Sequence, residues 1–256
     1  MGRYDGYLLC TDFDGTLYFH NEEEPIHAAD LEAIRAFQEA GGLFGACTGR
    51  PARALTVQTE GLVPFDFYIA LTGGTVFDRD LNPIYVRDLP RDLVRELFDR
   101  YAPQARGGIA LACAADDYWV VGDVDTSDWP VQKAPTFNDL PAPYQGMGME
   151  TATVEEAEAL AAEVNALYGD VACAYVNLAS IDILPAGCSK GTGLRRAADY
   201  YGASLTGGIG DSFNDLPLIE AADVGYTFNR CDAAMRSAAN VLVDGVNEAL
   251  EDFMAR

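Results

Sequence analysis

The sequence is poor in positive charge. Lysine and arginine together number 17, against 40 aspartates and glutamates, so the formal net charge is −23. A chain this acidic repels polyanions, which argues against nucleic acids and anionic membranes as partners. The excess of acid also fits a salt-adapted protein or simply a very soluble surface.

Long apolar runs and paired cysteines are missing as well. No apolar run approaches the roughly 20 residues of a membrane-spanning helix, and the N-terminal stretch MGRYDGYLL lacks the apolar region of a signal peptide. We therefore expect a soluble, cytoplasmic protein. The six cysteines form no Cys-x-x-Cys pair and most lie in apolar runs, so we expect reduced, buried thiols rather than disulfides or a metal site.

Two parts of the chain, residues 1–83 and 185–256, alternate short apolar strands with amphipathic helices. In ADLEAIRAFQEAGG, Leu31, Ile34 and Phe37 recur at helical spacing before a glycine stop. Hydrophobic residues make up 49% of the 256 residues, enough for a sizeable core. The alternation predicts a doubly wound, Rossmann-like α/β core with a parallel sheet covered on both faces.

Residues 84–184 follow a different pattern. A helical stretch precedes two strand-like runs, and this order occurs twice: RDLVRELFDRY before IALACA and YWVVG, then VEEAEALAAEVNALY before VACAYV and SIDILP. Consecutive strands pair most simply as antiparallel hairpins. The pattern predicts an inserted α+β cap domain. The stretch from Gly122 to Gly146, rich in proline, aspartate and glycine, is expected to be a loop.

Polar side chains follow three predicted core strands and open one core helix. In a parallel sheet, ligands bind beyond the carboxyl ends of the strands, so these side chains are expected to meet at one edge. They lie in the stretches DFDGTL, CTGR, SKGTGL and GDSFND, and they are Asp12, Asp14, Thr48, Gly49, Lys190, Asp211, Asn214 and Asp215.

Such a set of residues suits phosphoryl transfer. Converging carboxylates require a cation, and magnesium prefers oxygen ligands. One carboxylate can attack phosphorus to form an acyl phosphate, and a second can protonate the leaving oxygen and then activate water. A threonine hydroxyl and a lysine ammonium supply donors to phosphate oxygens. The paired acids Asp12 and Asp14 can therefore divide the roles of nucleophile and general acid/base.

The four stretches resemble, in order, the four motifs of the haloacid dehalogenase-like hydrolases. The insertion between the second and third stretches resembles the subfamily that carries an α/β cap there, the Cof-type phosphatases. The resemblance covers essentially the whole chain. One position departs from it, because LTGG has Thr72 where the subfamily usually has asparagine.

The resemblance implies roles for each site residue. Asp12 would be the nucleophile and Asp14 the general acid/base. Phosphate binding falls to Thr48, Gly49, Lys190 and Asn214, and Mg²⁺ to Asp12, Asp14 through its backbone carbonyl, Asp211 and Asp215. His20 and His27 are expected to be surface or packing residues.

The function expected from this resemblance is hydrolysis of a small phosphorylated metabolite through an aspartyl-phosphate. Sugar phosphates rank first as substrates and phosphorylated cofactors second. Two alternatives stay open: a phosphomutase that passes the phosphoryl group to a second hydroxyl, and a sugar-phosphate-binding regulator without turnover. We expect a monomer or a small homo-oligomer.

Overall fold

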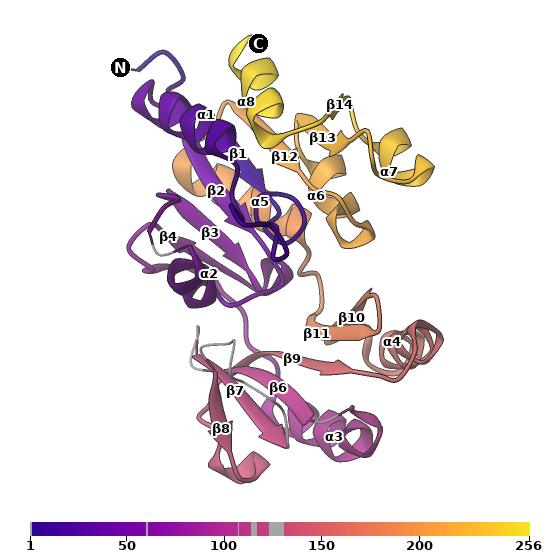
Figure 1. The fold of residues 1–256 in the computed structure, drawn as a ribbon. Helices are drawn as coiled ribbons and strands as arrows, with labels where there is room; N and C mark the ends of the chain where they lie inside the picture. The colour runs from indigo at the N-terminus through magenta and orange to yellow at the C-terminus, as the bar shows by residue number, and fades with distance from the viewer. Residues whose placement is uncertain (1, 60, 107, 114–116, 123–130) are drawn as a thin grey trace.

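The larger of two β-sheets forms the body of the molecule. The computed structural model describes residues 2–59, 61–106, 108–113, 117–122 and 131–256, and within them this sheet has eight strands in the order β14-β13-β12-β1-β2-β3-β4-β5 (Figure 1). Its first six strands in that order are parallel, and β4 and β5 pair antiparallel. The strands are β1 (Tyr7–Thr11), β2 (Leu43–Cys47), β3 (Phe67–Ala70), β4 (Thr75–Asp78), β5 (Pro83–Val86), β12 (Leu205–Ile209), β13 (Val224–Phe228) and β14 (Val241–Val243).

Helices cover both faces of this sheet. On one face lie α1 (Ala28–Glu39) and α8 (Val246–Met254), which contact each other, and on the other lie α5 (Lys190–Tyr201) and α6 (Leu216–Ala221). Successive residues of a strand point to opposite faces. Leu9 accordingly packs in the cluster that includes α1 and α8, whereas Leu8 packs in the cluster that includes α5. The predicted doubly wound α/β core is confirmed. Two short helices, α2 (Ala52–Gln58) and α7 (Ala233–Ala238), complete this part.

The smaller sheet has six strands in the order β10-β11-β9-β6-β7-β8. Both expected hairpins, β6–β7 and β10–β11, are antiparallel. The elements of this part are α3 (Arg91–Tyr101), β6 (Gly108–Cys113), β7 (Asp117–Gly122), β8 (Gln132–Ala134), β9 (Tyr144–Glu150), α4 (Val154–Tyr168), β10 (Ala172–Asn177) and β11 (Ser180–Pro185).

The expectation that Gly122 to Gly146 is a loop was wrong in part. The segment contains β8, which pairs with β7, and the first residues of β9, which lies between β6 and β11. Residues 123–130 lie outside the described part of the chain. Two residues of β9, Gly146 and Gly148, are glycines, which have a low strand propensity. Pairing with a strand on each side outweighs this low propensity, because β-propensity depends mainly on tertiary context.

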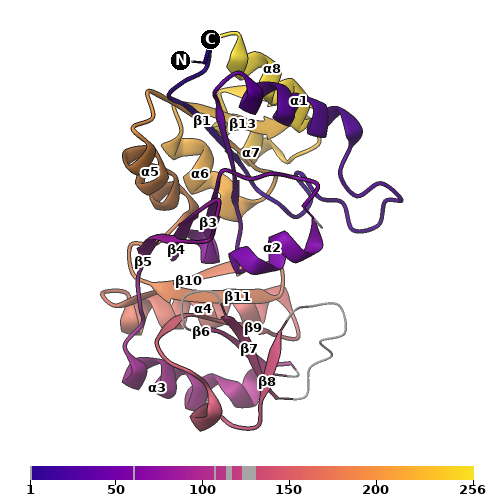
Figure 2. The ribbon, with the colours of Figure 1, turned by 90° about the vertical axis from the view of Figure 1, so that its left-hand side faces the viewer.

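The smaller sheet carries helices on one face only. Ile109, Leu111 and Met147 pack with residues of α3 and α4 in a second core. The opposite face is turned toward the larger sheet (Figure 2). The domain boundaries predicted after residues 83 and 184 fall inside β5 and β11, and division into domains at those points stays a prediction.

Two other expectations concern cysteine and membranes. All six cysteines are free in the structure, and five of them are buried while Cys173 is half-buried. Their burial fits the prediction of buried thiols, and their reduced state stays a prediction. Among the described residues, no helix combines the length and apolarity that a bilayer span requires.

Two glycines let the first turn of α5 lie close to its neighbours. A Cβ on Gly193 would meet Ile69 Cγ2 at 2.3 Å, and one on Gly191 would meet the carbonyl oxygen of Pro217 at 2.1 Å. Ser189 caps the helix by accepting a hydrogen bond from the Thr192 N–H. This close packing presents the first residue of α5, Lys190, at the edge of the sheet.

Gly193→Ala tests the packing of α5. Alanine raises intrinsic helix stability by about 1 kcal/mol, but the added methyl group collides with Ile69. We therefore expect a net destabilisation of roughly 1–3 kcal/mol, the usual cost of overpacking. Urea unfolding measures the change, with Asp199→Ala, an exposed position on the same helix, as the control. A variant more stable than the wild type would show that α5 shifts without cost.

Candidate active site

A buried lysine joins two carboxylates at the carboxyl end of β1. Asp12 directly follows β1, and its backbone N–H donates to the Ile209 carbonyl of β12 at 2.8 Å. Lys190 Nζ donates to Asp12 Oδ1 at 2.6 Å and to Asp215 Oδ1. Lys190 is 1% exposed, and the sequence has only one other lysine, Lys133. A buried ammonium in such contact with two acids is tightly placed.

Burial and neighbouring charges set the protonation of this group. Burial and the charge of Asp215 raise the pKa of Asp12 to about 8, although Lys190 opposes the shift. Burial by itself lowers the pKa of Lys190, but the charges of Asp12 and Asp215 outweigh it and raise the pKa well above its ordinary value. Lys190 is therefore a permanent cation, and Asp12 requires further positive charge to be fully ionised near neutral pH.

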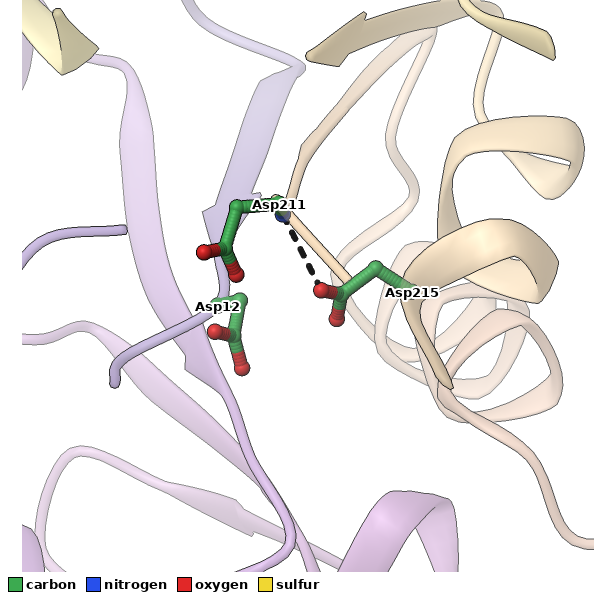
Figure 3. Close-up of side chains that lie close together, drawn as sticks. All are labelled: Asp12, Asp211 and Asp215. Carbon is green, nitrogen blue, oxygen red and sulfur yellow. Dashed lines mark hydrogen bonds between the residues drawn. The ribbon is translucent and has the colours of Figure 1, made fainter. Parts of the chain in front are cut away.

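A third carboxylate, Asp211, lies beside this pair. Asp12, Asp211 and Asp215 each offer an oxygen, and these oxygens all lie within 4.8 Å of one another (Figure 3). Burial and Asp215 raise the pKa of Asp211. One ammonium against three acids leaves an excess of negative charge, so the donor set fits a hard divalent cation such as Mg²⁺. Magnesium itself stays a prediction.

The three acids differ in the lone pairs that they leave available. Asp215 Oδ2 accepts from the backbone N–H groups of Asp211 and Ser212 at 3.1 and 3.0 Å and from Ser212 Oγ at 3.1 Å, and its Oδ1 accepts from Lys190. A carboxylate has about four acceptor positions, and most of those of Asp215 are used, although the single Ser212 hydroxyl proton also has Asn214 Oδ1 within 2.7 Å. Asp215 thus shapes the loop and orients Lys190, while Asp12 and Asp211 keep free lone pairs for a cation.

The carboxylate of Asp14 is held by a different set of side chains. Arg50 Nε donates to Asp14 Oδ2 at 2.7 Å, and Arg50 Nη2 donates to Oδ1 at 2.6 Å. His20 Nε2 lies 2.7 Å from the same Oδ1. Planar, two-point pairing of this kind fixes both the position and the rotation of a carboxylate. His20, expected to be a surface or packing residue, therefore contacts a predicted catalytic acid.

These groups surround one cavity of about 480 Å³ between the two sheets. Of the predicted site residues, six line it: Asp12, Asp14, Thr48, Gly49, Lys190 and Asn214. Asp211 and Asp215 join the site through the carboxylate cluster. Arg50, which follows Thr48 and Gly49 in CTGR, lines the cavity as well, and so do Tyr118 and Asp182, which the sequence analysis did not single out. Asp182 left a signal, because it alternates with apolar Ile181 and Ile183 in SIDILP, as expected for a strand with two different faces.

Thr72, the position that departs from the resemblance, contacts residues 48–49, the segment that follows β2. Its backbone N–H donates to the Thr48 carbonyl at 2.9 Å. Its φ of 50° lies in the left-handed region, which asparagine adopts more readily than β-branched residues do. The backbone geometry thus accounts for asparagine being the usual residue here.

A sequence model of the haloacid dehalogenase-like hydrolases matches residues 9–250. The chain belongs to this family. The resemblance drawn from the four motifs is confirmed, including the Cof type. A solved haloacid dehalogenase-like hydrolase from Bacteroides thetaiotaomicron has a TM-score of 0.80 at 20% identity, with 96% of this chain and 98% of that chain covered. This likeness confirms the fold.

Two curated relatives extend over nearly all of this hydrolase. It is 25% identical over 270 residues to the 5-amino-6-(5-phospho-D-ribitylamino)uracil phosphatase YitU of Bacillus subtilis (strain 168), with 97% of this chain and 98% of that protein covered. It is 22% identical over 269 residues to the pyridoxal phosphate phosphatase YbhA of Escherichia coli (strain K12), with 96% and 97% covered.

Magnesium binding and pH are expected to be coupled in this hydrolase. Because the pKa of Asp12 is raised to about 8, a cation that binds this carboxylate must displace a proton at lower pH. At one subsaturating Mg²⁺ concentration, the rise in melting temperature should therefore be larger at about pH 8 than at about pH 6, since stabilisation grows with affinity. Thermal melts with Mg²⁺ and with a chelator provide the measurement.

Asp211→Asn and Asp223→Asn are the matched variants for this experiment. Asp211 belongs to the carboxylate cluster, whereas Asp223 bonds Thr206 at the other end of the sheet. The rise in melting temperature should be largely lost in the first variant and kept in the second. A rise that is the same at both pH values, or that survives Asp211→Asn, would contradict the assignment.

Proposed function

We propose that this hydrolase is a magnesium-dependent phosphatase that cleaves a small phosphate monoester through an aspartyl-phosphate. The observation that carries the proposal is the asymmetry of the Asp12 carboxylate. Its Oδ1 is held by Lys190 at 2.6 Å, while no hydrogen bond from the described residues reaches Oδ2. A fixed carboxylate with one free oxygen at the wall of a cavity is arranged for nucleophilic attack.

In the first step, Asp12 Oδ2 attacks phosphorus and the bond from phosphorus to the ester oxygen breaks. Lys190 reduces the repulsion between the anionic nucleophile and the anionic phosphoryl group. Thr48, Gly49 and Asn214 line the same cavity and supply hydroxyl, backbone and amide groups to phosphoryl oxygens. A bound Mg²⁺ would hold Asp12 ionised and offset charge on the phosphoryl group.

Asp14 would move the protons of both steps. In its acid form it protonates the departing alcohol oxygen, and as a carboxylate it then takes a proton from water that attacks the phosphorus of the aspartyl-phosphate. The bond from phosphorus to Asp12 breaks, which releases inorganic phosphate and restores the Asp12 carboxylate. Arg50 and His20, which hold Asp14, orient it for this work.

The names of the relatives support the class of substrate. YitU is named for a phosphorylated ribitylaminouracil and YbhA for pyridoxal phosphate, and both are small phosphate monoesters with a polar leaving group. The cavity of about 480 Å³ has room for a leaving group of that size. We therefore place this hydrolase among phosphatases of phosphorylated metabolites of the sugar or cofactor type.

The two acids should respond differently to substitution. Asp12→Asn should abolish turnover, because an amide does not replace the attacking carboxylate. Asp14→Asn should lose roughly 10²–10⁴-fold in kcat on an alkyl phosphate, the usual worth of general acid/base catalysis. Its loss on p-nitrophenyl phosphate should be smaller, because that leaving group needs little protonation. Steady-state phosphate release with Mg²⁺ gives these values.

The same assay separates the alternatives. A mutase would convert a sugar phosphate into an isomer visible by phosphorus NMR without releasing phosphate, and a regulator would bind it without any change. Near-normal phosphate release by purified Asp12→Asn would contradict the proposed mechanism. Asp232→Asn, which alters a helix cap outside the cavity lining, is a control expected to keep full activity.

A further inference from the structure

The cavity-facing side of the smaller sheet is hollowed at its centre. Ala110 of β6 pairs with Gly148 of β9, and Gly148 pairs with Asp182 of β11, so the three residues form one row across the sheet. Paired residues point to the same face. With Gly108 they line the cavity. Ala110 and Gly148 give the two central strands small side chains at this point, and their row continues through the Asp182 carboxylate to Tyr175 of β10.

Asp182 reaches from this floor to the segment that follows β2. A Cβ on Gly148 would lie 3.2 Å from Asp182 Oδ1 and 3.5 Å from the Tyr118 hydroxyl, and a Cβ on Gly49 would lie 3.3 Å from Asp182 Oδ2. The carboxylate therefore stands beside the glycine that follows Thr48. In the proposed reaction, the leaving-group atoms next to the ester oxygen would lie close to this carboxylate.

The Asp182 carboxylate lacks a hydrogen-bond donor within the described part of the chain. Burial raises its pKa to about 6, although the charge of Lys190 opposes the shift, so it is mainly an anion near neutral pH. Asp182 is half-buried at the cavity wall, where water can solvate its carboxylate in the free protein. A bound molecule that displaces this water must supply a donor in its place, since an anion left without a donor is costly.

We propose that Asp182 selects the leaving group by accepting a hydrogen bond from its hydroxyl or amino group, while the floor of Gly108, Ala110 and Gly148 seats the rest of it. The inference rests on the proposed phosphatase function and adds the chemistry of its substrate. Leaving groups with a donor near the ester are accepted. Leaving groups with a second anion at this point are rejected by charge repulsion.

A matched pair of esters tests the role of Asp182. Glucose 6-phosphate and cyclohexylmethyl phosphate both place the phosphate on a carbon next to a six-membered ring, but only the first carries hydroxyl groups. In the wild type, kcat/KM for the sugar should exceed that for the hydrocarbon. In Asp182→Ala this ratio should fall about tenfold or more, because a hydrogen bond to a charged group is lost. Activity on p-nitrophenyl phosphate should change by less than about threefold, since that ester lacks the donor.

Asp170→Asn is the matched control, because Asp170 is an exposed acid of the same part of the chain outside the cavity lining. It should leave all three substrates unchanged. Asp182→Asn, which keeps the shape and one acceptor oxygen, should give an intermediate ratio and serves if the alanine variant fails to fold. Melting temperatures check folding.

The outcomes separate this inference from the function on which it rests. A ratio unchanged in both Asp182 variants, or an equal loss on all three esters, would overturn the role of Asp182 while phosphate release from p-nitrophenyl phosphate still supported the phosphatase. Absence of phosphate release from every ester by the wild type with Mg²⁺ would contradict the proposed function itself and the inference with it.

Discussion

The contact of Lys190 with Asp12 and Asp215 is the constraint around which the site is built. The lysine brings together β1, the start of α5 and the loop after β12. An ammonium enclosed at 1% exposure is stable only while both carboxylates stay near it, since a buried charge without partners is expensive. The glycines of α5 and the crowded lone pairs of Asp215 both serve to keep this contact. The fold therefore holds the Asp12 carboxylate through its contact with Lys190 on one oxygen.

Around this centre, the site has two separate groups of charge. Asp12, Asp211 and Asp215 form an acid-rich pocket that a divalent cation would balance, while Asp14 lies outside it in contact with Arg50 and His20. The separation matters because the two acids of DFDGTL need opposite properties. A nucleophile must be ionised, whereas a general acid must carry a proton when the leaving oxygen departs. In the structure the two neighbouring aspartates have different partners, since Lys190 holds Asp12 whereas Arg50 and His20 hold Asp14.

The smaller sheet lines one side of the cavity with residues of β6, β7, β9 and β11. One face is apolar and packs against α3 and α4 in a second core. On the other face, Ala112 and Leu184 pack into the core of the larger part, while Gly108, Ala110, Gly148 and Asp182 line the cavity.

The sequence by itself determined the α/β class of the larger part, the family and the acidic centre of the cavity with the threonine and lysine beside it. Local signals carry that information: apolar periodicity, glycine stops, and polar residues placed directly after buried strands. Tertiary structure decided the rest. Strand β9 was not predicted, because its glycines have a low strand propensity and are held in a strand only by pairing with β6 and β11. Asp182 and Arg50 acquired roles through neighbours that lie far from them in the chain, and His20 became a partner of Asp14 because a loop returns to it. Contacts between distant segments depend on how sheets and helices pack, and no local pattern encodes that packing.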